Sequence, residues 1–78
     1  MKLYYSPISQ HSRRVISLLE EEGIKYEAIE VDMMDGEYLS DSYMAINPNH
    51  QVPTLVDGEL VIHESHAIMR YLCRKYLL

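Results

Sequence analysis

A short β-hairpin pattern in the second half of the chain is the strongest constraint on its fold. Residues 54–56 (Thr-Leu-Val) and 60–62 (Leu-Val-Ile) are β-prone runs that flank Asp57-Gly58. Asp-Gly between two such runs is among the strongest short-range hairpin signals, because a tight turn needs residues that tolerate a positive φ. The sequence therefore predicts two neighbouring antiparallel strands, and a sheet to which the rest of the chain contributes.

The first half of the chain predicts a strand, a helix and a second strand. Residues 2–5 (Lys-Leu-Tyr-Tyr) form a β-prone run that Pro7 ends. Apolar residues then recur at helical spacing over roughly residues 10–22, and Gly23 follows in the position of a helix C-cap. Residues 26–31 alternate in the manner of a strand. A helix between two strands predicts that the two strands are parallel.

Two further helices are expected in the second half. Residues 32–40 show no period and predict a loop, and residues 41–46 predict a short helix that Asn47-Pro48-Asn49 ends. From Ser65 onward, apolar residues again recur at helical spacing and predict a closing helix. The element order is then β-α-β-(α)-β-β-α, which corresponds to one α/β domain with a four-stranded mixed sheet.

Composition and charge narrow the classes of partner. A chain of 78 residues builds a single core, and 47% hydrophobic with 24% charged residues is the balance of a folded domain. The net charge of -5 disfavours nucleic acid and anionic membranes, because phosphate binding needs a basic surface. No apolar run approaches the ~20 residues that cross a bilayer, and Cys73 has no second cysteine with which to pair. We expect a cytoplasmic protein with neither a nucleic-acid nor a membrane partner.

A proline directly before a predicted strand, in Val52-Pro53-Thr54, is the first candidate for a functional position. A cis bond before Pro53 costs only about 0.5–1 kcal/mol. Such a turn would leave the Val52 backbone N–H and C=O free to pair with a peptide-like ligand as an added strand. The alternative is an ordinary trans proline at the start of a strand.

Glu64-Ser65 at the start of the closing helix is the second candidate. The first N–H groups of a helix have no internal partner and carry a partial positive charge, which favours a ligand carboxylate at Ser65. Glu64 would then take an ammonium group, so that the pair suits the head of an α-amino acid. The alternative is that Ser65 is a helix N-cap and Glu64 an acid that complements the helix dipole.

Ser9, at the mouth of the first helix, is the third candidate. Its hydroxyl would donate to a thiolate, and the helix N-terminus would lower the pKa of a bound thiol. The alternative is that Ser9 only caps the helix. His11 has no visible carboxylate partner, which disfavours a serine hydrolase.

Taken together, these segments resemble the N-terminal domain of glutathione transferases, most of all the theta, delta and related bacterial serine types. The resemblance spans nearly the whole chain. It implies a thioredoxin-like α/β fold over residues 1–78, without the helical C-terminal domain that completes such an enzyme and builds most of its electrophile site. The matching segments are SQHSR at 9–13, NPNHQVPTL at 47–55, DG at 57–58 and ESHAI at 64–68.

The resemblance also implies roles for residues at the centre of the site. Ser9 matches the serine that activates the glutathione thiol. Val52 matches the residue whose backbone pairs with the cysteinyl part of glutathione, and Pro53 matches the cis-proline beside it. Glu64 and Ser65 match the pair that holds the γ-glutamyl end.

At the other end of the ligand, His50 and Gln51 fall where such enzymes hold the glycine carboxylate or nearby backbone. The resemblance further implies glutathione as co-substrate, a small electrophile as second substrate, no metal, and a homodimer in the full-length form. The isolated domain is then expected to have weak activity or none.

A redox enzyme and a tyrosine-dependent transferase are less well supported. A glutaredoxin-like oxidoreductase needs a low-pKa cysteine at the start of the first helix, where Ser9 and Ser12 occupy the C-x-x-C positions. Cys73 is expected to be buried in the closing helix. Tyr4 and Tyr5 raise the possibility of a tyrosine-activated thiol, but neighbouring residues of a strand face opposite sides, and we expect both to pack.

A protein-interaction domain of a translation or stress-response assembly remains the alternative function. Transferase-like domains occur in such assemblies, and composition does not distinguish them from enzymes. The presence of Ser9 together with Glu64 and Ser65 favours ligand binding.

Overall fold

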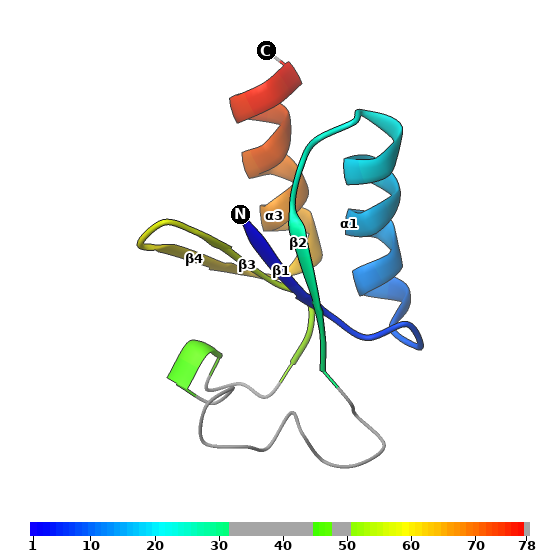
Figure 1. Cartoon of the computed structure of the whole chain (residues 1–78), viewed down its shortest axis with the longest axis vertical. Coiled ribbons are helices and arrows are strands. Elements are labelled where there is room, and N and C mark those ends of the chain that lie inside the picture. The colour runs from blue at the N-terminus through cyan, green and yellow to red at the C-terminus, as the bar shows by residue number, and fades with distance from the viewer. Residues whose placement is uncertain (32–44, 48–50, 78) are drawn as a thin grey trace.

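One mixed sheet of four strands organises the computed structural model, which describes residues 1–31, 45–47 and 51–77. A strand, a helix and a second strand come first along the chain, and two further strands and a second long helix follow (Figure 1). The elements are β1 (Lys2–Tyr5), α1 (Gln10–Glu21), β2 (Glu27–Glu30), β3 (Thr54–Asp57), β4 (Leu60–His63), α3 (Ser65–Leu72) and the π-helical turn η2 (Cys73–Leu77).

The strands lie in the order β2-β1-β3-β4. β1 is parallel to β2, while β3 is antiparallel to both β1 and β4. Leu55 in β3 lies opposite Leu3 of β1 on one side and Ile62 of β4 on the other. The prediction of an α/β domain with a four-stranded mixed sheet is therefore confirmed.

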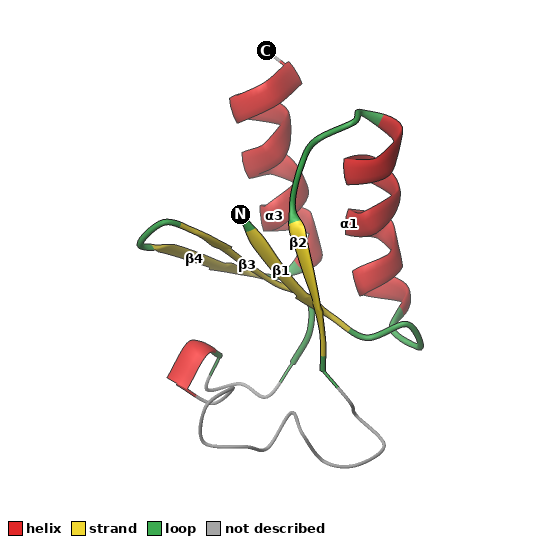
Figure 2. Ribbon diagram, viewed as in Figure 1, coloured by secondary structure: helices red, strands yellow, loops and turns green. Residues whose placement is uncertain are grey.

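Both long helices cover the same face of the sheet (Figure 2). The main core lies between this face and the helices, and Tyr5 packs against it, whereas Tyr4 points to the opposite face and packs against Val31 and Val52. The two tyrosines thus lie on opposite faces, as the alternation of a strand requires. The buried residues of the main core are Leu3, Val15, Leu19, Ile24, Leu55, Ile68 and Leu72.

The end of α1 follows the predicted C-cap. Gly23 has a φ of 65°, its N–H donates to the Glu20 carbonyl at 3.3 Å, and the Ile24 N–H donates to the Leu19 carbonyl at 3.0 Å. This pair of bonds is the Schellman motif, and Ile24 and Leu19 meet in the core as that motif favours. The turn directs the chain out of α1 and back toward β2.

The turn of the hairpin lies one residue later than Asp57-Gly58. Asp57 pairs with Leu60 inside the ladder, which leaves Gly58 and Glu59 as the two turn residues. Gly58 has a φ of 62° and Glu59 has no positive φ. That combination is the pattern of a type II′ turn, in which glycine occupies the first central position.

The closing helix also differs in part from the prediction. It is α-helical only to Leu72 and continues as the π-helical turn η2. Cys73, expected to be buried, is half-buried. Of the predicted short helix, the structure describes only Ala45 and Ile46, which are both helical, and residues 41–44 lie outside the described part of the chain.

An ionic contact joins the end of the chain to the hairpin. The Tyr71 hydroxyl and the Lys75 ammonium both donate to the same carboxylate oxygen of Asp57. These bonds, first from Lys75 and then from Tyr71, hold the pKa of the Asp57 carboxyl below its ordinary value of 3.8. The contact therefore links η2 to β3 most strongly while Asp57 is ionised.

Replacing Leu55 with Ala should lower the free energy of unfolding by about 2–5 kcal/mol, because a fully buried leucine leaves a cavity. Leu60 is 46% exposed on β4, and Leu60→Ala should cost less than about 1 kcal/mol. Urea denaturation followed by circular dichroism measures both. Equal losses in the two variants would contradict the central place of Leu55 in the core.

Asp57→Asn should weaken the acid dependence of stability. Because the folded-state pKa of Asp57 is depressed, its contribution is present above about pH 4 and is lost as the pH falls through the folded-state value. Urea midpoints measured from neutral to acidic pH should thus fall less steeply in the variant. Glu59→Gln in the exposed turn is the matched control and should follow the wild-type profile; a parallel profile for Asp57→Asn would refute the linkage.

Candidate functional site

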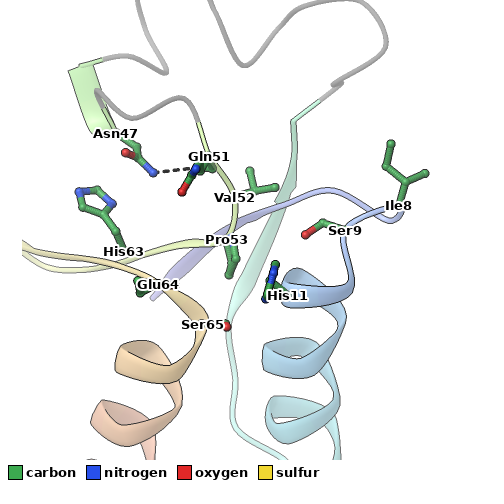
Figure 3. A pocket seen from close by; sticks show the side chains of 10 residues that line it. All are labelled: Ile8, Ser9, His11, Asn47, Gln51, Val52, Pro53, His63, Glu64 and Ser65. Atoms are coloured by element: carbon green, nitrogen blue, oxygen red, sulfur yellow. Dashed lines mark hydrogen bonds between the residues drawn. The ribbon is translucent and has the colours of Figure 1, made fainter.

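A pocket of about 630 Å³ opens where the loop after β1, the segment before β3 and the start of α3 meet. Its volume lies within the roughly 300–1,000 Å³ range of small-molecule sites. The N-termini of α1 and α3 both face it (Figure 3). The described residues that line it are Ile8, Ser9, His11, Asn47, Gln51, Val52, Pro53, His63, Glu64 and Ser65.

Six of the seven predicted site residues line this one pocket. The seventh, His50, lies outside the residues that the structure describes. The six that the fold brings together are Ser9, Gln51, Val52, Pro53, Glu64 and Ser65.

Four lining residues were not predicted, and they differ in how visible they are in the sequence. Ile8 stands at the rim, 64% exposed and pointing away from Ser9 (Figure 3). His11 directly follows Gln10 in the first turn of α1. Asn47 was interpreted as the end of a helix and as part of the matching segment 47–55, with no role of its own, although asparagine beside proline often bonds local backbone. His63 was part of no motif, and its position just before Glu64 was the only available signal.

Ser9 is the N-cap of α1. Its φ and ψ are -89° and 120°, and its Oγ accepts a hydrogen bond of 3.2 Å from the Ser12 N–H. Accepting this bond occupies a lone pair and leaves the hydroxyl hydrogen available to donate. The capping role and the predicted donor role are therefore compatible, and in Figure 3 the hydroxyl points toward Val52 and Pro53.

The loop that carries Ser9 is held by further serine contacts. The Ser6 N–H donates to the Ser12 Oγ at 3.3 Å, and the Ser9 N–H donates to the Ser6 carbonyl at 3.1 Å. Ser6 and Ser12 are both buried, at 2% and 0% exposure. Ser12, the second C-x-x-C position, thus has a structural role beneath the site.

Val52 presents an unoccupied backbone edge. The Val52–Pro53 peptide is cis. Within the described part of the chain, no hydrogen bond engages the Val52 N–H or C=O. Pro53 is buried and β3 begins at the next residue, so the edge of Val52 lies two residues before the start of this central strand.

The start of α3 has an unusual local structure. Glu64 is its N-cap, with a φ of 75° and no side-chain capping bond, so the alternative that Ser65 caps this helix is wrong. Positive φ is uncommon outside glycine, and such strained residues concentrate at functional sites. The first N–H groups of α3 consequently have no side-chain partner from the cap and face the pocket.

Two buried polar atoms flank Glu64. Ser65 is 1% exposed, and neither its Oγ nor the His63 Nδ1 has a hydrogen-bond partner. These are the only buried side-chain nitrogen or oxygen atoms without a partner among the described residues. An unsatisfied buried group costs about 1–3 kcal/mol, and both belong to residues that line the pocket.

The described residues hold no cluster of the usual metal ligands. Across residues 1–31, 45–47 and 51–77, no three His, Cys, Asp or Glu side chains are grouped as metal ligands would be. In the same residues, no helix is long and apolar enough to cross a membrane.

Ser65→Ala should leave the stability of the ligand-free chain unchanged or raise it by up to about 1 kcal/mol, because it removes a buried hydroxyl without a partner. Ser12→Ala is the matched control. Ser12 is equally buried but accepts a bond from the Ser6 N–H, and its loss should cost about 1–3 kcal/mol. Urea denaturation compares the two, and a larger loss in Ser65→Ala than in Ser12→Ala would contradict this account.

Known proteins share the sequence pattern and the fold of this chain. Residues 3–77 match the family described as "Glutathione S-transferase, N-terminal domain". The chain is 44% identical over 72 residues to glutathione S-transferase F10 of Arabidopsis thaliana, a match that covers 92% of this chain and 34% of that protein. It spans about a third of the length of the curated relatives it matches.

Solved structures extend the match to three dimensions. Human glutathione S-transferase T1-1 in its apo form superposes with a TM-score of 0.95 at 39% identity, over 99% of this chain and 32% of that one. Human glutathione transferase theta-2, in complex with glutathione and an unknown ligand, gives a TM-score of 0.95 at 37% identity, over 97% and 31%. The chain belongs to the glutathione S-transferase N-terminal domain family, and its fold is the thioredoxin-like fold of that family.

Proposed function

We propose that this pocket binds glutathione and activates its thiol for conjugation to an electrophile. The observation that supports the proposal best is the meeting of three features in one pocket. These are a Val52 backbone edge that makes no hydrogen bond among the described residues, a start of α3 at Ser65 without a side-chain capping bond, and a serine hydroxyl at the N-terminus of α1. Each suits a different part of one γ-linked tripeptide.

The γ-glutamyl end is assigned to Glu64 and Ser65. A carboxylate placed against the α3 N-terminus would receive backbone N–H bonds and a bond from the Ser65 hydroxyl, which would gain the partner it lacks. The exposed Glu64 carboxylate beside it would take the ammonium group. The strained φ of Glu64 is then a cost that ligand binding offsets.

The cysteinyl part is assigned to Val52. A peptide that lies along this edge would exchange N–H···O=C bonds with the Val52 backbone, in the manner of a strand added to a sheet. Such bonds need no particular side chain at Val52 and impose an extended backbone on the ligand.

The thiol is assigned to Ser9. Donation from its hydroxyl to the sulfur stabilises the thiolate, and the α1 N-terminus adds positive potential. Within α1, all of whose residues are described, the first turn has no acidic side chain to weaken that potential. The thiol proton leaves to solvent. The thiolate sulfur then forms a bond to the electrophilic carbon as the bond from that carbon to its leaving group breaks, and the leaving group departs to solvent with the electron pair of that bond. Ser9 stays uncharged and unmodified throughout.

The proposal also covers the glycine end of glutathione and the parent enzyme. Gln51, exposed at the mouth of the pocket, and His50 receive the glycine end. Residues 1–78 are the N-terminal domain of a homodimeric cytoplasmic transferase whose helical domain supplies most of the site for a small electrophile. Glutathione is the co-substrate, and the reaction uses no metal.

Ser9→Ala should raise the pKa of the bound thiol by about one to two units, since a hydrogen bond to a charged group contributes about 1.5–3 kcal/mol. The dissociation constant of glutathione at neutral pH should change less than about threefold, because the other two parts of the ligand keep their contacts. Ultraviolet absorbance of the thiolate during a pH titration measures the first quantity, and calorimetry measures the second.

Two variants separate the role of the Ser9 hydroxyl as a donor to the thiolate from its role as the N-cap of α1. Ser9→Thr keeps both and should behave as the wild type, whereas Ser9→Asp keeps the cap but has no hydroxyl, and should raise the thiol pKa. An unchanged thiol pKa in Ser9→Ala would assign activation elsewhere. No heat from the wild type at millimolar glutathione would favour the protein-interaction domain instead.

A further inference from the structure

We infer that Asn47 is a positioning residue, which holds the Val52 edge in the orientation that pairs with the cysteinyl part of the ligand. The inference rests on the proposed function and concerns the same pocket. Asn47 does not contact the reacting sulfur. It fixes the orientation of the Val52 backbone, which binds the ligand next to that sulfur.

The amide of Asn47 spans the segment that contains Val52. Its Nδ2 donates to the Gln51 carbonyl at 2.9 Å and to the Thr54 Oγ1 at 3.1 Å. Gln51 precedes Val52 and Thr54 follows Pro53, so one nitrogen bridges both ends of a four-residue segment (Figure 3 draws the bond to Gln51). Val52 between them makes no hydrogen bond within the described residues, so its orientation depends on its neighbours.

Thr54 gives this bridge a rigid anchor. It is fully buried and begins β3, where it pairs with Tyr4 of β1 and with His63 of β4. The residue after His63 is Glu64, the N-cap of α3. The paired residues Thr54 and His63 therefore connect the Asn47 bridge to the start of α3, which is assigned to the γ-glutamyl group. This connection fixes the position of the Val52 edge relative to the start of α3.

The chemistry of the bridge is specific to a short primary amide. Asn47 is 1% exposed, and its single nitrogen supplies both hydrogens. Aspartate at this position would have no donor and would place a carboxylate against the Gln51 carbonyl. Alanine would remove the bridge without adding charge. Both changes should loosen the Val52 edge and leave the start of α3 as it is.

This separation allows a test with two probes. L-Glutamate carries the α-amino acid head alone, whereas glutathione also uses the Val52 edge. In Asn47→Ala, the dissociation constant of glutathione should rise about tenfold or more, and that of L-glutamate should stay within about twofold. NMR shifts of the Ser65 and His66 amides follow both titrations in the 78-residue chain.

Three further variants test whether the loss of affinity is confined to glutathione or affects both probes. Asn47→Asp should weaken glutathione at least as much as Asn47→Ala. Thr54→Val, which removes one acceptor at constant shape, should weaken it about threefold with the same discrimination. Ser65→Ala should weaken both probes, because both carry the head group. Circular dichroism and urea midpoints establish that each variant is folded.

The outcomes distinguish a failure of the positioning role from a failure of the proposed function. Equal weakening of both probes in Asn47→Ala, or no weakening of either, would overturn the positioning role. If Asn47→Ala does not fold, Thr54→Val decides, and an equal effect on both probes or none would overturn it. Failure of the wild-type chain to bind either probe would overturn the proposed function itself, and this inference with it.

Discussion

Burial of the two central strands beneath two helices is the interaction on which the rest of the structure depends. Leu3 and Leu55 lie opposite each other in β1 and β3 and are both 0% exposed. They meet Val15 of α1 and Ile68 of α3 in one core. Because both helices pack on the same face and start at the same end, this burial brings two helix N-termini and the segment before β3 around a single pocket.

The unfavourable local features of the described residues are found at the pocket, and the burial of the core offsets their free-energy cost. Glu64 has a positive φ, and the only unpartnered buried side-chain atoms of the described residues belong to His63 and Ser65 on either side of it. At Gly23, by contrast, the C-cap, its two hydrogen bonds and the buried Ile24 support one another. Local conflict of this kind concentrates where a protein binds ligands.

Much of the fold could be predicted from the sequence, because each element carried its own local signal. The helical period ended at Gly23, alternation identified β2, and β-prone runs identified the other three strands. The hairpin turn was placed one residue early, since Asp57-Gly58 and Gly58-Glu59 are both acceptable turns and only the pairing of Asp57 with Leu60 decides between them. The π-helical end of the closing helix had no signal in the apolar spacing.

By itself, the sequence determined the elements and the chemical groups at their ends: the Ser9 cap, the proline before β3 and the acid-serine pair at α3. Periodicity, capping and turn formation involve residues within a few positions of one another, which is why they can be read along the chain. Only the tertiary structure decided that these ends share a pocket, that Asn47 bridges Gln51 and Thr54, and that the Ser65 hydroxyl has no partner among the described residues. Whether a buried polar group is satisfied depends on residues far away in the sequence, and the packing of the sheet and helices brings those residues together.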